Sequence, residues 1–136
     1  MANTWVDNAF TLLNVAAASY SNLGVKPVVF INKKGLVGSD RKVGKAPGKK
    51  GSSVRLTNVG VDITQSSDGT AIFSKQTGEV RGRANNFTNC IALWNDVKSL
   101  LTSDSADRYF FEGETEPTAL NKNLVQFTLI ATRIDC

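Results

Sequence analysis

The sequence of 136 residues has the length of one domain, and its 41% hydrophobic and 21% charged residues are typical of a globular chain. It contains no histidine, which excludes His-dependent catalytic triads, and only Cys90 and Cys136 could supply sulfur to a zinc ion. The net charge of +4 is uneven, because residues 1–55 carry +7 and residues 56–136 carry −3. We therefore expect a single domain over 1–136 that is not an enzyme, needs no cofactor or metal, and has a polyanionic partner.

The first half of the chain alternates clear and ambiguous segments. Trp5 to Tyr20 fits either an amphipathic helix or a strand from Phe10 to Val15. A clearer strand follows at 28–31. Residues 35–51 hold five glycines and one proline, which predicts a loop or a long flexible hairpin.

Two longer strands are predicted next. In 53–64, Val54 and Leu56 lie on one face and Arg55 and Thr57 on the other. The segment 65–69 ends in Asp-Gly and predicts a turn. The chain then returns as a strand over 70–84, with Thr77-Gly78 as a candidate break.

The second half contains the best helix, at about 86–103, where apolar residues recur at helical spacing and Asn85 or Asn86 can cap the start. Ser103-Asp104 predicts a second short helix through 109–111, which Gly113 and Pro117 would end. Alternation over 123–135 predicts a final strand. The expected fold is α+β, with an antiparallel sheet and two helices of the C-terminal half on one face.

Targeting and sulfur chemistry give few signals. The N-terminal residues lack the pattern of a secretory signal, and no apolar run is long enough to cross a bilayer, so we expect no membrane partner. Cys90 falls on the apolar helical face and is expected to be a buried thiol. For Cys136, an intermolecular disulfide is an alternative that the sequence leaves undecided.

The Gly/Lys-rich loop does not match a phosphate-binding loop. Five residues separate Gly38 from Gly44 where the motif has four, and Ala46 follows Lys45 where it has Ser or Thr. Glu112, Glu114 and Glu116 are interpreted as a solvated acidic patch rather than a catalytic pair. These observations argue against nucleotide hydrolysis, and we expect no small-molecule substrate.

Binding to RNA fits the remaining pattern. Cations on strands can meet phosphates, while Thr, Asn and aromatic side chains can meet unpaired bases. An equally plausible alternative for each residue is that it only keeps one sheet face soluble. The lysines of the Gly/Lys-rich loop would attract RNA regardless of its nucleotide sequence. They are Lys42, Lys45, Lys49 and Lys50. The candidate RNA-binding residues are Lys33, Lys34, Arg55, Thr57, Lys75, Arg81 and Arg83.

The predicted helix has a wide apolar surface. Such a helix needs cover on more than one side, which a second subunit could supply. The alternative is packing against its own sheet and the second helix. The candidate dimer-interface residues are Phe87, Ile91, Trp94, Val97 and Leu101.

This layout resembles the coat proteins of small single-stranded RNA bacteriophages, the leviviruses. The similarity lies in the stretch Ile91-Ala92-Leu93-Trp94-Asn95-Asp96-Val97-Lys98-Ser99-Leu100-Leu101, followed by Asp107-Arg108-Tyr109-Phe110-Phe111 and Pro117. The strand expected at 123–135 is similar to a circularly permuted variant of the family, in which the first strand has moved to the C-terminus.

The resemblance implies a virion protein that is assembled in the cytoplasm of a bacterial host. It implies a homodimer with a continuous sheet, in which helices cross over the partner's sheet and dimers close into an icosahedral shell. One sheet face would contact genomic RNA, and in many relatives it binds a hairpin that represses replicase translation. Residues 65–69 would lie at contacts between dimers.

Two other functions stay open. One is a cellular RNA-binding module, such as a ribosome-associated protein. The other is a β-rich adhesin or tail component that binds no nucleic acid. Self-assembly and bound RNA separate the three.

Overall fold

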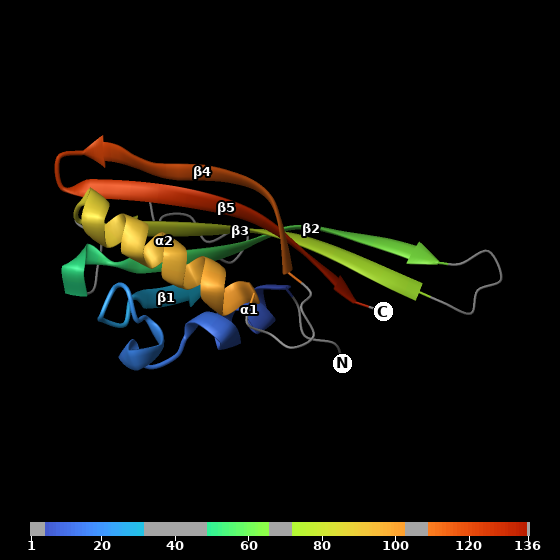
Figure 1. The fold of residues 1–136 in the computed structure, drawn as a ribbon. Coiled ribbons are helices and arrows are strands. Elements are labelled where there is room, and N and C mark those ends of the chain that lie inside the picture. Colours follow the sequence, from blue (N-terminus) through green and yellow to red (C-terminus); the bar gives the residue numbers. More distant parts are fainter. Residues whose placement is uncertain (1–4, 32–48, 66–71, 103–108, 136) are drawn as a thin grey trace.

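The computed structural model describes residues 5–31, 49–65, 72–102 and 109–135 (Figure 1). Two α-helices, α1 (Trp5–Leu13) and α2 (Phe87–Thr102), lie on one side of a five-stranded sheet. The short 3-10 turns η1 (Ala17–Ser19) and η2 (Lys49–Gly51) connect elements. The strands are β1 (Val28–Ile31), β2 (Ser53–Gln65), β3 (Ile72–Ala84), β4 (Tyr109–Asn121) and β5 (Leu124–Asp135).

The sheet has the strand order β1-β2-β3-β5-β4. β1 pairs with β2 in parallel, and the other three pairings are antiparallel. β1 reaches only to Leu56 of β2, and β5 ends opposite Ser74 of β3. The distal part of the β2–β3 ladder therefore projects beyond the body of the sheet (Figure 1).

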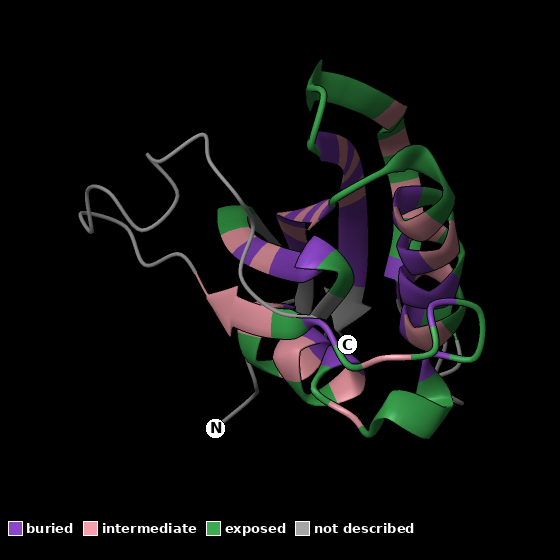
Figure 2. Ribbon diagram, turned by 90° about the vertical axis from the view of Figure 1, so that its left-hand side faces the viewer, coloured by how far each residue is buried: buried purple, intermediate pink, exposed green. Residues whose placement is uncertain are grey.

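The core lies between the helices and one face of the sheet, as the buried positions in Figure 2 show. Alternate strand residues point into it, which is the two-residue period expected of a sheet with one covered face. The buried apolar side chains of the strands include Val54, Leu56, Val80, Ala84, Tyr109, Leu124, Val125, Phe127, Leu129 and Ala131. The helices contribute Trp5, Ala9, Leu13, Cys90, Leu93, Val97 and Leu101.

Two glycines of β3 let aromatic rings lie directly on the sheet. A Cβ atom built at Gly78 would be 2.5 Å from the Trp5 ring, and one built at Gly82 would be 2.1 Å from the Phe127 ring. Both distances are far below van der Waals contact. Trp5 is also held by hydrogen bonds, since its backbone N–H donates to Gln76 Oε1 (2.6 Å) and its backbone carbonyl accepts from the Tyr109 hydroxyl (3.0 Å).

The buried carboxylate of Asp96 in α2 forms hydrogen bonds with the segment that follows α1. Asp96 accepts hydrogen bonds from the Leu23 N–H (2.8 Å), the Asn22 side-chain amide (2.8 Å) and the Asn22 N–H (3.2 Å). Lys50 approaches the same segment, because its Nζ donates to the Leu23 carbonyl (2.6 Å). Satisfying a buried charge in this way offsets the cost of removing it from water.

Most of the predicted elements are confirmed. The expected strands at 28–31, 53–64, 70–84 and 123–135 correspond to β1, β2, β3 and β5, and the expected helix at 86–103 is α2. Asn86 caps α2, since its Oδ1 accepts the Asn89 N–H (2.8 Å). Of the two alternatives for the opening segment, the helix is right. No helix of the described residues has the length and hydropathy to cross a membrane.

The predicted short helix through 109–111 is wrong, because β4 occupies these residues. Tyr109 and Phe111 face the core while Phe110 is exposed, which is a strand period. Gly113 and Pro117 are not helix stops. They lie at shifts in the pairing of β4 with β5, on an edge strand where proline is tolerated.

Three further expectations need correction. The sheet is mixed rather than antiparallel, because β1 joins β2 in parallel. The two helices do share one face, but only α2 belongs to the C-terminal half. The candidate break at Thr77-Gly78 does not exist, since β3 is continuous and the irregularity is a bulge in β2 between Asn58 and Gly60. The loop at 35–48 and the turn at 66–69 lie outside the described residues.

Replacing Gly82 with alanine tests the close approach of Phe127. The added methyl group must displace the ring or the strand, and overpacking of this kind costs about 1–3 kcal/mol. We expect the urea midpoint of the Gly82→Ala variant to fall at an unchanged m-value. Gly60→Ala is the control, because a Cβ atom there meets nothing within 4 Å. Equal midpoints for the two variants would contradict this packing.

Candidate nucleic-acid interface

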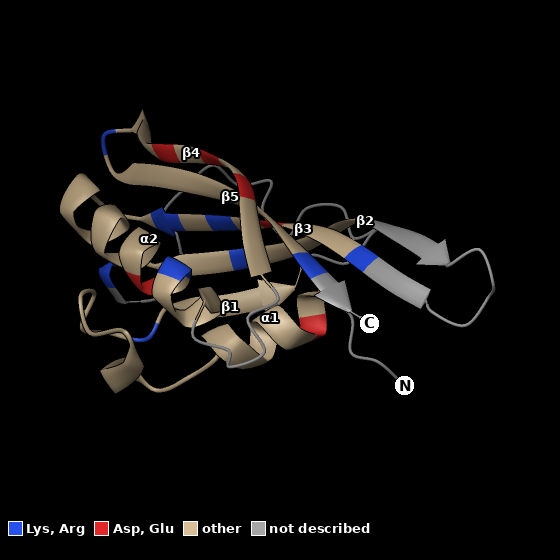
Figure 3. Ribbon diagram, turned by 45° about the vertical axis from the view of Figure 1, so that its right-hand side comes forward, with Lys and Arg blue, Asp and Glu red and all other residues tan. Residues whose placement is uncertain are grey.

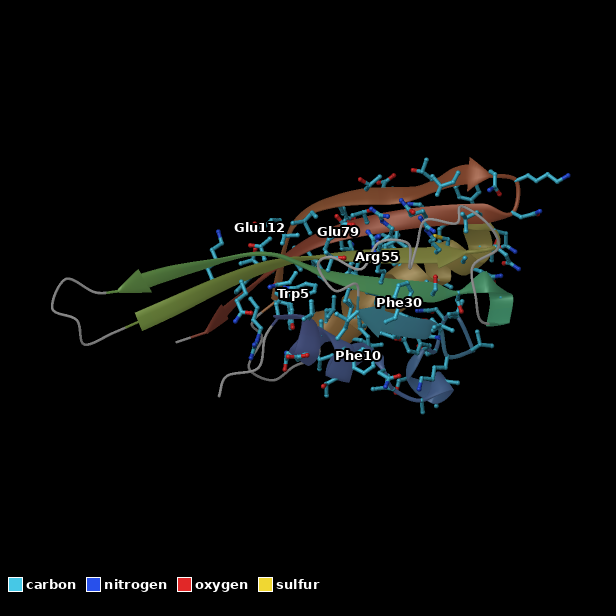
Figure 4. The ribbon with its side chains drawn as sticks, turned by 180° about the vertical axis from the view of Figure 1, so that it is seen from behind. Trp5, Phe10, Phe30, Arg55, Glu79 and Glu112 are labelled. Carbon is cyan, nitrogen blue, oxygen red and sulfur yellow. The ribbon has the colours of Figure 1, made fainter. Side chains whose placement is uncertain are left out.

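The sheet face opposite α1 and α2 carries the charged and polar side chains of the strands. No described helix covers this surface, which we call the open face; Figure 4 views it directly, with Phe30, Arg55 and Glu79 labelled. Its central residues alternate with the buried residues of the core along each strand. They are Phe30 of β1, Arg55 and Thr57 of β2, Thr77, Glu79, Arg81 and Arg83 of β3, and Gln126, Thr128 and Ile130 of β5.

The strand register brings the arginines together. Arg55 of β2 pairs directly with Arg81 of β3, which pairs with Thr128 of β5. Phe30 of β1 continues the same row on the other side of Arg55. Because neighbouring strands are about 4.8 Å apart, these side chains form one continuous row across the sheet. Arg83 is two residues further along β3, and so lies on the same face. Figure 3 shows these cations grouped on β2 and β3.

Glu79 forms ion pairs with two of the arginines. Its Oε1 lies 3.2 Å from Nη2 of Arg55 and 3.2 Å from Nη2 of Arg81. The Arg55 side chain is 11% exposed and that of Glu79 is 23% exposed, so the pair is only partly screened by solvent. Burial, and then the charge of Arg81, lowers the pKa of Arg55, while Glu79 opposes that change. We define Arg55, Glu79 and Arg81 as the arginine–glutamate cluster.

Polar side chains extend the cluster along β5. Arg83 donates from Nε to Gln126 Oε1 (2.8 Å), which orients its guanidinium. Burial, followed by the charge of Arg81, lowers the pKa of Arg83. Thr57 lies opposite Glu79 in the register, and its buried hydroxyl makes no hydrogen bond to the part of the chain that the structure describes. The open face therefore combines cationic donors with neutral and anionic acceptors.

The predicted RNA-binding residues do not all gather in one place. Arg55, Thr57, Arg81 and Arg83 are neighbours on the open face. Lys75 shares this face but is six residues from Arg81 along β3, about 20 Å at the usual rise of a strand. It forms an ion pair there with Glu112 (3.4 Å). Lys33 and Lys34 lie outside the described residues.

Six of the ten central residues of the open face were absent from the predicted site, Thr77 and Ile130 among them. Phe30, Glu79, Gln126 and Thr128 join it through the register with Arg55, Arg81 and Arg83. A signal was present for Gln126 and Thr128, since both alternate with apolar residues in the last strand. Glu79 shares the strand alternation of Arg81 and Arg83, but a carboxylate repels phosphate and so does not fit a prediction based on phosphate binding.

The outer side of α2 is the second surface of interest. Phe87 and Ile91 are 50% and 43% exposed, although both side chains are apolar. Trp94 is half-buried, and Nζ of Lys98 lies 4.6 Å from the centre of its ring. Lys98 in turn forms an ion pair with Glu114 of β4 (3.2 Å).

Two of the predicted interface residues belong to the core of their own chain. Val97 and Leu101 are fully buried on the inner side of α2, where they pack in the hydrophobic core of the same chain. The alternative of packing within the chain is therefore the right one for these two positions. Within one chain, α2 covers β3, β4 and β5, and the crossing of the helix over a partner's sheet stays a prediction about the dimer.

The thiol of Cys90 is buried, as expected, and its Sγ lies 3.5 Å from the Val125 carbonyl oxygen. Burial raises the pKa of this thiol to about 12, so it is protonated near neutral pH. Cys136 is outside the described residues. Within the described ranges, no three His, Cys, Asp or Glu side chains form a group that could hold a metal ion.

Comparison with known proteins adds no identification. The chain matches no protein-family model, and no curated protein is significantly similar to it.

Proposed function

We propose that this chain is a shell-forming subunit that binds single-stranded RNA on its open face, in the manner of the phage coat proteins that its sequence resembles. The observation that carries the proposal is the grouping of Arg55, Arg81 and Arg83 on adjacent strands of one face. Guanidinium groups bind phosphates through paired hydrogen bonds. The neighbouring Thr, Gln and Phe side chains can contact bases that are not stacked in a duplex.

The shape of the face favours a single strand over a duplex. Side chains on a sheet stand nearly perpendicular to it, so the row from Phe30 to Thr128 presents one shallow surface. Single-stranded RNA can lay its phosphates and splayed bases on such a surface.

Self-association is supported by the outer side of α2. Phe87 and Ile91 lie one helical turn apart and expose apolar surface that a second copy would remove from water. In this proposal the two copies meet through these residues. Val97 and Leu101 take no part, since each chain buries its own.

A sheet continuous between two copies would require a free strand edge. β4 is poorly suited, because Pro117 and three shifts in register interrupt it and Glu112, Glu114 and Glu116 follow its length. β2 is the better candidate: no described strand pairs with it on the β1 side beyond Leu56. We therefore place a sheet-sharing contact on the distal part of β2, as a contact between copies that is separate from the one through α2, since the two lie at opposite ends of the molecule (Figure 1).

Purification followed by size-exclusion chromatography and electron microscopy tests the proposed function. We expect closed particles of uniform size that contain RNA protected from nuclease. A soluble monomer that binds RNA would instead support the cellular RNA-binding module. Protein without nucleic-acid absorbance and without particles would contradict the proposal, and would favour the adhesin or tail component.

Removing two arginines tests the open face. The Arg81→Ala/Arg83→Ala variant should bind RNA more weakly, and its plot of log K against log[salt] should be shallower by about 1.4, since each phosphate contact to a single strand contributes about 0.7. Titration of a fluorescent RNA at several salt concentrations measures both. The Lys26→Ala/Lys122→Ala variant is the control, because it loses the same charge at exposed positions away from this face. Identical slopes for the two variants would contradict the assignment.

Polar substitution on the outer side of α2 tests self-association. The Phe87→Ser/Ile91→Ser variant should keep its fold, because both side chains are largely exposed, but should fail to form dimers or particles. Light scattering coupled to size-exclusion chromatography measures the mass, and circular dichroism checks the fold. Phe110→Ser is the control, since Phe110 is 49% exposed and lies on β4, away from both proposed contacts between copies. Normal assembly of the double variant would rule out this surface.

A further inference from the structure

Glu79 places a carboxylate in the middle of a cationic face. This group weakens the attraction of the surface for phosphates, because it repels phosphate and offsets one of the three positive charges on these strands. The side chain is accessible, at 23% exposed, and its Oε1 lies 3.2 Å from the guanidinium groups of both Arg55 and Arg81; Figure 4 labels Glu79 and Arg55. The arrangement suits a ligand that both donates and accepts hydrogen bonds.

The arginine–glutamate cluster offers N–H donors next to a carboxylate acceptor. The Watson–Crick edge of guanine is complementary to this set, since it presents the O6 acceptor beside the N1–H and N2–H donors. Adenine, cytosine and uracil each place an acceptor where guanine has one of those two donors, and that acceptor would face the carboxylate. Guanine is therefore the base that fits.

The edge of a base can reach this cluster only when the base is unpaired, since pairing uses the same edge. Phe30 lies in the same row as Arg55, at the β1 end, and offers a flat apolar surface to an adjacent base. This second feature also favours a flexible single strand.

We infer that Glu79 reads an unpaired guanine on the open face, with Arg55 or Arg81 donating to its O6. This inference rests on the proposed RNA-binding function and adds base specificity to it. The competing explanation is structural: Glu79 does no more than separate two arginines whose like charges would otherwise repel.

Binding of matched RNA oligonucleotides distinguishes the two explanations. We compare an adenine-only strand with alternating adenine–guanine and adenine–cytosine strands of equal length, by fluorescence anisotropy at one salt concentration. The wild-type protein should prefer the guanine-containing strand by about tenfold, which is typical of one well-made set of base contacts. Stronger binding of the cytosine-containing strand, or equal binding of all three, would overturn the inference.

The Glu79→Gln variant isolates the carboxylate, because it keeps the side-chain length and removes the charge. We expect the guanine preference to fall several-fold while affinity for the adenine-only strand stays the same or rises. An equal rise for every strand, with the guanine preference intact, would mean that Glu79 is only a spacer.

Glu112→Gln is the matched control, because Glu112 is also a carboxylate on the open face, but its ion pair is with Lys75 and not with an arginine of the cluster. It should leave the guanine preference unchanged. A loss of preference equal to that of Glu79→Gln would overturn the assignment to Glu79.

A test on the unaltered protein covers the case in which Glu79→Gln does not fold. Replacing guanine with inosine removes only the N2 amino group, and should weaken binding several-fold; an unchanged affinity would contradict contact with the carboxylate. The failure of the proposed function has a separate signature, since the wild-type protein would then bind none of the strands at low salt.

Discussion

The structure depends on the contact between Trp5 and the sheet at Gly78. The indole ring can lie flat against β3 only because no Cβ atom stands in its place. Hydrogen bonds from Trp5 to Gln76 and from Tyr109 to Trp5 then join α1 to β3 and β4. The edge of Tyr109 packs on the same indole, with ring centres 5.6 Å apart. Through these contacts, Trp5 places α1 against this face of the sheet, which becomes the side of the core.

The position of the charged surface follows from the packing of the helices on one face of the sheet. With both helices on one face, every second residue of β2, β3 and β5 is turned to the other face, and three arginines arrive side by side through the register alone. Like charges so close together need an acceptor nearby, and Glu79 supplies it. The same carboxylate gives the face a hydrogen-bonding character that a row of cations would lack.

The helix α2 has two unequal sides. Its inner side is satisfied by the chain's own sheet, while Asp96 fixes the segment that follows α1. Its outer side retains Phe87 and Ile91 at the surface. The wide apolar pattern that suggested a partner in the sequence was therefore mostly a signal of burial within one chain, and only the outer residues leave room for a second copy.

The sequence by itself determined the elements whose pattern is local. Period-two alternation identified β2, β3 and β5 and separated Val54 and Leu56 from Arg55 and Thr57, while helical spacing and Asn86 marked α2. These signals succeed because each residue's environment repeats at the period of its own element.

The tertiary structure decided what depends on distant partners. Tyr109 to Phe111 form a strand because β5 pairs with them and the core accepts their alternate side chains, and a window of sequence contains neither fact. The parallel pairing of β1 and the meeting of Arg55, Glu79 and Arg81 likewise depend on register between segments. The strand period alone places Glu79 on the face of Arg81 and Arg83, but register is set by packing across the whole sheet, so only the folded chain could show that Arg55 joins them.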